Sequence, residues 1–244
     1  MVAIIVVLTV IVFIVVDGLL RIVTQKVHAS KIKKGGAAVD VGLERSRKRQ
    51  APRQAVSAPG RHGEPELALP AGLFVHPGHT WAEILRSGQA RVGLDDFVRY
   101  ALGRPDRLIL RQPGEQVRQG EPMLTVEQAG RQLVLPAPVS GMIEDRNEQL
   151  AVHPDALEGR AYGENWAYTL KPSRLGAEIG SLKVAEKACT WLREEMQRLI
   201  AWIGTLPHAR PGVAMQDGGT LVFGVLSQMD EKTWRDFQAQ FLHR

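Results

Sequence analysis

The first stretch of the chain is almost entirely apolar. Residues 2–16 contain one polar side chain, Thr9, and the apolar pattern resumes two residues later and continues to Val23. A helix over residues 2–23 would be about 33 Å long, which is sufficient to cross the hydrocarbon core of a bilayer. The pattern therefore predicts a transmembrane helix within residues 1–23.

The charges that flank this segment distinguish a membrane anchor from a cleaved signal peptide. A signal peptide carries basic residues before its apolar run and small residues at a cleavage site after it. Here no basic residue precedes the run, whereas several follow it: Arg21, Lys26, Lys31, Lys33 and Lys34. We therefore expect an uncleaved single-pass anchor in the cell inner membrane, with the N-terminus outside and the remaining chain in the cytoplasm.

Two charged residues near the end of the predicted helix are candidates for a role in the membrane. Asp17 and Arg21 are four residues apart and would lie on the same helical face. The preferred interpretation is an ion pair near the cytoplasmic interface, with the arginine extending toward the headgroups. The alternative is a carboxylate that handles protons or contacts another subunit. The candidate membrane residues of this segment are Val6, Val10, Phe13, Asp17 and Arg21.

Residues 24–67 have a composition that does not support a packed core. They contain no aromatic residue and many glycine, proline and basic residues. Such a composition is typical of a flexible tether. Its positive charge would also favour contact with anionic lipids of the bilayer.

Short β-type runs alternate with turn signals from residue 68 to residue 175. Glycine-containing turns are expected at Gly114 and Gly120, and the runs MLTV and QLVL flank a loop with Gly130, which predicts a β-hairpin. Regularly spaced short strands are typical of a small barrel or sandwich. We therefore expect one mainly β domain over residues 68–175.

The rest of the chain predicts helical additions. Apolar residues at helical spacing indicate an amphipathic helix within residues 176–206, with Trp191 and Trp202 on its apolar stripe. Packing of this stripe on the chain's own β-domain is the preferred role, and insertion into a partner's groove is the alternative. Residues 207–244 contain a linker, a short apolar run and a terminal helix with an N-cap near Asp230, too little material for an independent core.

Composition and charge exclude several classes of protein. The net charge of the chain is +5, yet ten Lys or Arg residues and only two acidic residues lie between Arg21 and Arg53. The rest of the chain is therefore mildly acidic and lacks the basic face that nucleic-acid binding requires. The single cysteine, Cys189, excludes an intramolecular disulfide and any cysteine zinc cluster.

Two short polar motifs are candidates for chemistry. His76 and His79, with Glu83 nearby, could ligate a metal, but the Pro-Gly turn between the histidines favours hydrogen-bonded structural roles. Asp95 and Asp96 lie where a helix should begin, so helix capping accounts for them without catalysis. No nucleophile, phosphate-loop or zinc-protease motif occurs. We expect no catalytic residue, no metal and no cofactor.

The order of several motifs in the β-domain resembles that of the glycine cleavage system H protein, a relative of the lipoyl and biotinyl carrier domains. The matching motifs are His79-Thr-Trp81, RVGLDDFVRYALG, GEQVRQGEPMLTVE from Gly114, APVSG at 137–141, Gly163, Trp166 and the run Lys171, Pro172 and Ser173. The resemblance covers nearly the whole domain. It implies a barrel-sandwich fold with a carrier hairpin.

The resemblance also implies where a lipoyl group would be attached. The family carries it on a lysine at the hairpin tip, in Val-Glu-Ser-Val-Lys-Ala, and an ungapped alignment with VEQAGR places Gly130 at that position. No lysine occurs between Lys48 and Lys171. Arg131 is adjacent, but its guanidinium stays protonated and is not an acyl acceptor. We therefore expect a sound fold, since glycine permits a tight hairpin turn, and no lipoylation.

These expectations together predict a non-catalytic, membrane-anchored scaffold or accessory subunit. Its partners would be the lipid bilayer and an integral membrane protein complex, for which a bacterial respiratory or photosynthetic complex is the first candidate. One alternative is a component that still associates with glycine cleavage or other lipoate-dependent enzymes. Another is a regulatory module that binds a small molecule in the former arm-binding groove.

Overall fold

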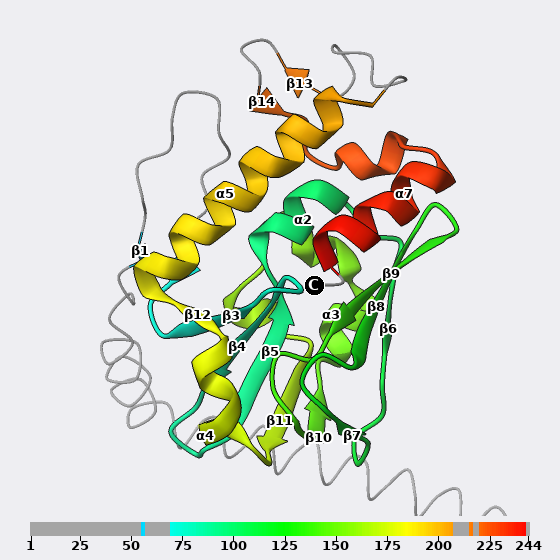
Figure 1. Ribbon diagram of the computed structural model, residues 1–244. Coiled ribbons are helices and arrows are strands. Elements are labelled where there is room, and N and C mark those ends of the chain that lie inside the picture. Colours follow the sequence, from blue (N-terminus) through cyan, green and yellow to red (C-terminus); the bar gives the residue numbers. More distant parts are fainter. Residues whose placement is uncertain (1–54, 57–68, 207–214, 217–219, 243–244) are drawn as a thin grey trace, which may run out of the picture. The chain divides into compact units, whose positions relative to one another are not determined.

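The computed structural model describes residues 55–56, 69–206, 215–216 and 220–242 (Figure 1). The predicted transmembrane helix and most of the predicted tether lie outside these residues. In the part of the chain that is described, no helix is both long enough and apolar enough to span a bilayer.

Two antiparallel sheets form the body of the described part. The larger sheet has the order β12 (Lys183–Val184), β3 (Leu73–His76), β4 (Thr80–Ile84), β5 (Ala90–Leu94), β11 (Tyr168–Pro172), β10 (Gly141–Arg146) and β7 (Gln116–Val117). The smaller sheet has the order β6 (Arg107–Leu110), β8 (Pro122–Gln128) and β9 (Arg131–Pro136). Two short pairs are separate: β1 (Ala55–Val56) with β2 (Leu69–Pro70), and β13 (Met215–Gln216) with β14 (Thr220–Leu221).

Helices lie at both ends of this body. The α-helices are α2 (Asp96–Leu102), α3 (Glu148–Val152), α4 (Leu175–Glu178), α5 (Ala185–Gly204) and α7 (Glu231–Phe237). The shorter elements are η1 (Pro154–Glu158), η2 (Gly163–Asn165), η3 (Ile179–Ser181), η4 (Val225–Gln228) and the π-helical η5 (Gln238–Leu242). Figure 1 shows α2, α5 and α7 together at one end and α4 at the other, beside the ends of β7, β10 and β11.

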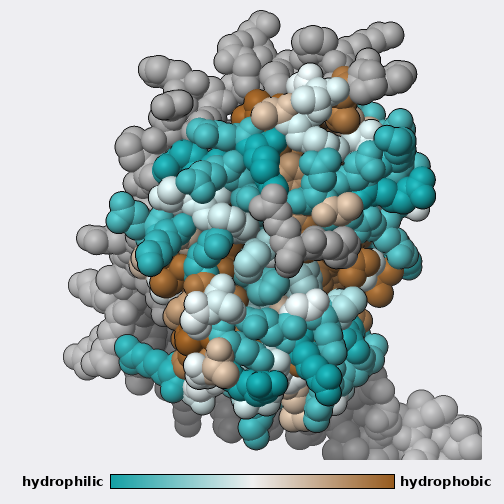
Figure 2. All heavy atoms as spheres, in the orientation of Figure 1, coloured by the Kyte–Doolittle hydropathy of each residue, from teal (hydrophilic) through white to brown (hydrophobic). Residues whose placement is uncertain are grey.

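Alternating apolar side chains of the strands form the core between the sheets. Trp81 of β4 is fully buried, and its Nε1 donates to the carbonyl of Ala161 at 3.0 Å. Its neighbour across the ladder is Gly93, where a Cβ would lie 2.9 Å from Cζ2 of the indole. Gly93 therefore lets the large ring lie across β5 without displacing the strand. The outer surface is mostly hydrophilic on the face shown in Figure 2, with small hydrophobic areas between the polar ones.

The mainly β sandwich with C-terminal helices confirms the coarse prediction, and the β8–β9 hairpin confirms the expected loop at Gly130. The structure adds detail at two of the predicted boundaries. Ala55 and Val56 fall inside the predicted tether but pair with β2. The long helix, α5, lies inside the range 176–206 in which it was expected, and it begins at Ala185 because Lys183 and Val184 extend to pair with β3. The β-domain therefore continues beyond residue 175.

Candidate functional site

The tip of the β8–β9 hairpin is a two-residue turn that projects from the domain. Ala129 and Gly130 join the strands, with φ of 50° and 75°. Positive φ at both central residues is the geometry that matches the twist of a tight hairpin, and glycine adopts it without strain. Both residues are exposed, and a Cβ at Gly130 would meet no atom within 4 Å. The position is therefore accessible, but it carries no side chain.

One side of the hairpin is held by the connection between α2 and β6. The Nε2 of Gln128 donates to the carbonyls of Leu102 and Arg104, at 2.7 and 2.6 Å. The amide of Ala129 donates to Oδ2 of Asp106 at 2.6 Å. These bonds fix the orientation of the tip on the domain.

The other side is held by the C-terminal segment, which we define as residues 220–242. The Nη1 of Arg131 donates to the carbonyl of Met229, and its Nη2 donates to that of Ser227 at 3.0 Å. The guanidinium also lies over the ring of Trp234, 4.7 Å from the centroid. Trp234 in turn donates from Nε1 to the carbonyl of Gln132 at 2.9 Å. Charged donors and a buried indole therefore join β9 to the C-terminal segment.

The same segment also contacts the end of α2. The hydroxyl of Tyr100 donates to the carbonyl of Leu221 at 3.1 Å, and the amide of Gly224 donates to the carbonyl of Tyr100 at 2.8 Å. Gly103 has φ of +75°, and a Cβ there would lie 2.5 Å from Cα of Gly224. The close approach of the two backbones therefore requires glycine at position 103.

Aromatic rings complete the packing of the C-terminal segment. Phe97 of α2 lies 6.1 Å from Phe237 and 5.5 Å from Phe241 between ring centroids. Trp202 of α5 contacts Phe241 edge-on at 5.7 Å. The C-terminal segment is therefore built into the core above α2, although its sequence is too short for a core of its own. Trp202 is partly buried in this cluster, against the chain's own residues.

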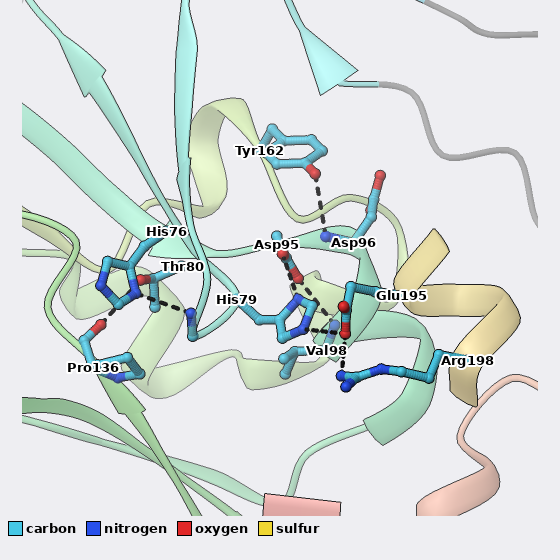
Figure 3. A network of polar contacts seen from close by, with 11 residues as sticks. His76, His79, Thr80, Asp95, Asp96, Val98, Pro136, Tyr162, Glu195 and Arg198 are labelled. Carbon is cyan, nitrogen blue, oxygen red and sulfur yellow. Dashed lines mark hydrogen bonds and ion pairs between the residues drawn. The ribbon is translucent and has the colours of Figure 1, made fainter. Parts of the chain in front are cut away.

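A second polar cluster lies at the junction of β4, α2 and α5 (Figure 3). The imidazole of His79 is fully buried, and its Nδ1 lies 2.9 Å from Oδ2 of Asp95. Its Nε2 lies 3.8 Å from Oε2 of Glu195, which also pairs with Arg198. The ring is stacked between Phe97, at 3.9 Å, and Trp191, at 4.8 Å. Trp191 is thus partly buried on the chain's own histidine.

The surroundings of His76 and His79 shift the pKa values of these two histidines in opposite directions. Burial alone would lower the pKa of His79, but the charge and hydrogen bond of Asp95, together with the nearby charge of Glu195, raise that pKa above its ordinary value. Burial, together with the charge of His79, lowers the pKa of His76 to about 4. A neutral His76 can accept the hydrogen bond from the amide of Gly78, 2.9 Å from its Nδ1.

This arrangement assigns structural roles to the polar motifs. Asp95 caps α2, because its Oδ1 accepts from the amide of Val98 at 3.1 Å, which confirms the capping prediction. Asp96 pairs with Arg99 at 2.7 Å, and burial raises the pKa of its carboxyl. The described residues include no group of three or more His, Cys, Asp or Glu side chains placed to hold a metal.

Sequence reasoning missed the contact between the hairpin and the C-terminal segment. From the sequence, the only conclusion about Arg131 is that it cannot replace the lysine as an acyl acceptor. Its hydrogen-bond partners in the structure lie almost a hundred residues further along the chain, so no local pattern indicates them. The two glycines that meet between α2 and η4, Gly103 and Gly224, are the sequence signal for this contact. Each is uninformative alone, because glycine occurs in many turns.

Known proteins resemble the β-domain and the start of α5. A family model described as "Glycine cleavage H-protein" matches residues 73–195. A probable glycine cleavage system H protein of Pyrococcus abyssi is 32% identical over 128 residues, which are 52% of this chain and 95% of the relative. The glycine cleavage system H protein of Methylococcus capsulatus is 36% identical over 118 residues, 48% of this chain and 91% of the relative.

A solved structure gives a match of similar extent. The crystal structure of a glycine cleavage system H protein from Mycobacterium marinum has 27% sequence identity and a TM-score of 0.45, and the match covers 50% of this chain and 98% of that one. The C-terminal segment lies beyond the residues that the family model matches.

Proposed function

The chain belongs to the glycine cleavage H-protein family. We propose that it is a non-catalytic member of this family that binds other proteins and does not carry lipoate. In this proposal it serves as a membrane-anchored scaffold or accessory subunit of a larger membrane assembly.

The observation that carries the proposal is the hairpin tip. Attachment of lipoate requires an amine that can be acylated, and the exposed turn consists of Ala129 and Gly130. The nearest lysines in the sequence are Lys48 and Lys171. The guanidinium of Arg131 stays protonated, and it already donates to carbonyls of the C-terminal segment. The residues at the tip therefore do not fit a lipoyl group.

The C-terminal segment supports the same proposal. It covers the surface beside the hairpin and above α2, where Trp234, Phe237 and Phe241 are buried. The C-terminal segment also takes up the side chain next to the tip, because Arg131 donates to the carbonyls of Ser227 and Met229. The hairpin thus serves as a packing surface within the chain.

The membrane part of the proposal depends on residues 1–23 and on the basic tether. A helix in the bilayer and a domain in the cytoplasm would supply two separate contacts to one assembly. The tether would keep the domain at a high local concentration near a partner that the helix already contacts. Two weak contacts on one chain then give a stable complex. An integral membrane complex, such as a bacterial respiratory or photosynthetic one, is the proposed partner.

A second candidate function is association with glycine cleavage or other lipoate-dependent enzymes. The observation that favours it is the coverage of the two H proteins described above, which this chain matches over 95% and 91% of their length. A chain with the complete domain could keep a docking surface for such enzymes without the arm. In that case it would compete with a lipoylated carrier for the same partner.

Purification of the tagged full chain from native membranes in a mild detergent tests these candidates. The proposal predicts that a fixed set of integral membrane proteins elutes with the chain in constant ratio through size-exclusion chromatography. Elution of the chain alone would contradict the proposal. Elution with soluble lipoate-dependent enzymes would contradict it as well, in favour of the second candidate.

A further inference from the structure

A groove lies at the end of the body opposite α7 and the hairpin tip, where α4 meets the ends of β7, β10 and β11 (Figure 1). Its volume is about 1040 Å³, at the upper end of the range found for small-molecule sites. Val117, Met142 and Pro172 give it an apolar lining, and Met142 is 38% exposed.

Three cationic side chains surround this apolar lining. Arg118, Lys171 and Arg174 all border the groove and are exposed. Within the described residues, none of the three side chains forms an ion pair or a hydrogen bond. Many other arginines of the described surface do pair with carboxylates: Arg99, Arg104, Arg107, Arg111, Arg146 and Arg198. The groove therefore brings together three cations that have no partner in the part of the chain that the structure describes.

The two carboxylates in the lining are engaged within the chain. Glu178 is buried and accepts hydrogen bonds from the amide of Ser140 at 2.7 Å and from its hydroxyl at 2.5 Å. Glu121 accepts from the amide of Arg118 at 2.9 Å. Both carboxylates thus accept hydrogen bonds from residues that line the groove. Their two negative charges balance only part of the positive charge of the three cations. The result is a positive groove on a mildly acidic body.

We infer that this groove binds an acidic segment of a partner protein, in which apolar side chains alternate with carboxylates. The inference rests on the proposed protein-binding role and specifies the chemistry of the partner. Apolar side chains would contact Met142 and Pro172, and carboxylates would pair with Arg118, Lys171 and Arg174. A concave site fits an inserted peptide better than the flat surface of a bilayer. The predicted tether is basic, so it does not complement this charge.

Fluorescence anisotropy on the full chain in dodecyl maltoside tests the inference. The probe is a fluorescein-labelled acidic peptide, Glu-Glu-Leu-Glu-Asp-Leu-Glu-Glu, and its uncharged Gln and Asn counterpart is the control peptide. The groove variant is R118E/K171E/R174E. The matched control variant is R86E/R160E/R193E, which reverses three cations outside the groove lining.

The inference predicts binding that weakens with salt and that falls about tenfold or more in the groove variant, since each exposed ion pair contributes a few-fold to affinity. The control variant should bind within about twofold of the natural chain. Equal losses in both variants would show attraction to overall charge and would overturn the inference. So would equal binding of the uncharged peptide, or no binding at all.

Two competitors distinguish other sources of negative charge. Inorganic phosphate and dihexanoyl phosphatidylglycerol are added at matched ionic strength, and the inference predicts that neither displaces the peptide at concentrations similar to that of the peptide. Displacement by the lipid would assign the groove to a membrane surface, and displacement by phosphate would assign it to a small anion. Either result overturns the peptide assignment, and neither changes the co-purification result on which the proposed function depends.

Discussion

Arg131 joins the hairpin to the carbonyl of Met229, 98 residues further along the chain. Its guanidinium also donates to Ser227 and lies over the ring of Trp234. A hydrogen bond from a charged donor contributes about 1.5–3 kcal/mol when buried and less when water competes. A cation–π contact at an exposed or half-exposed position adds about 0.5–1 kcal/mol. One side chain thus accounts for much of the attachment of the C-terminal segment to β9.

Replacing Arg131 by alanine should therefore lower the free energy of unfolding by about 1–3 kcal/mol. The carbonyls of Ser227 and Met229 lose their donors, and Trp234 becomes more exposed. Denaturant unfolding followed by tryptophan fluorescence measures the change. Arg160→Ala is the matched control, because its side chain is exposed and makes no ion pair within the described residues. Equal stability of the two variants would show that the segment does not depend on Arg131.

His76 gives a prediction about pH with a defined sign. Its pKa is lowered from 6.5 to about 4 in the folded state. Between these values the unfolded chain binds a proton that the folded chain does not. The stability that a neutral His76 contributes is therefore complete above pH 6.5 and decreases as the pH falls toward 4. His79 has the opposite sign, because its raised pKa gives stability below 6.5 that is lost as the pH rises through the folded value.

His76→Asn should accordingly make the pH dependence of stability shallower between pH 6.5 and 4. The asparagine keeps an acceptor for the amide of Gly78 but does not titrate. Urea unfolding at several pH values in this range measures the slope for the variant and for the natural chain. The carboxylates are common to both, so their contribution cancels in the difference. An unchanged slope would contradict the assignment of a low pKa to His76.

At the scale of elements, the hairpin and α2 determine where the C-terminal segment can lie. The β8–β9 hairpin, the N-cap of α2 at Asp95 and the N-cap of α7 at Asp230 all follow from the local sequence. Local sequence predicts such features because each depends on side chains within a few residues. The contact of α2 with η4 depends instead on two backbones that meet at Gly103 and Gly224, far apart in the sequence. No local pattern encodes that pairing.

The long helix illustrates a different limit of sequence analysis. The sequence predicts the apolar stripe of this helix, and Leu192, Met196 and Leu199 are buried, as a 3.6-residue period requires. The stripe does not specify which surface it covers. Stacking of Trp191 on His79 and contact of Trp202 with Phe241 depend on long-range packing. Whether the exposed edges of these indoles also contact a partner stays a prediction.

Gly103→Ala tests the close approach of α2 and the C-terminal segment. The added Cβ would lie 2.5 Å from Cα of Gly224, in addition to the strain of a positive φ, so the variant should lose about 2–4 kcal/mol. Gly114→Ala is the matched control: its φ is +92°, but a Cβ there meets nothing within 4 Å. It should lose only about 1 kcal/mol. Equal losses, measured by denaturant unfolding, would mean that backbone strain alone accounts for both.

At the scale of the whole molecule, an H-protein domain is combined with segments that its relatives do not match. The family match covers residues 73–195, and the remaining chain supplies a predicted membrane helix, a basic tether and the C-terminal segment. The C-terminal segment covers the surface beside the hairpin, whereas no described residue covers the groove at the opposite end. We propose that the domain is retained as a binding surface and carries no lipoyl group, since Ala129 and Gly130 at the tip have no amine to acylate.

Intact-mass measurement of the full chain purified from its native cells tests whether a lipoyl group is attached. A conventional H protein expressed in the same cells is the positive control, since it shows that the lipoylation machinery is active. We expect the control to carry the lipoyl adduct, whereas the chain with Gly130 at its hairpin tip should have the mass of its unmodified sequence. A lipoyl adduct on any residue of this chain would show that it is a lipoate carrier after all.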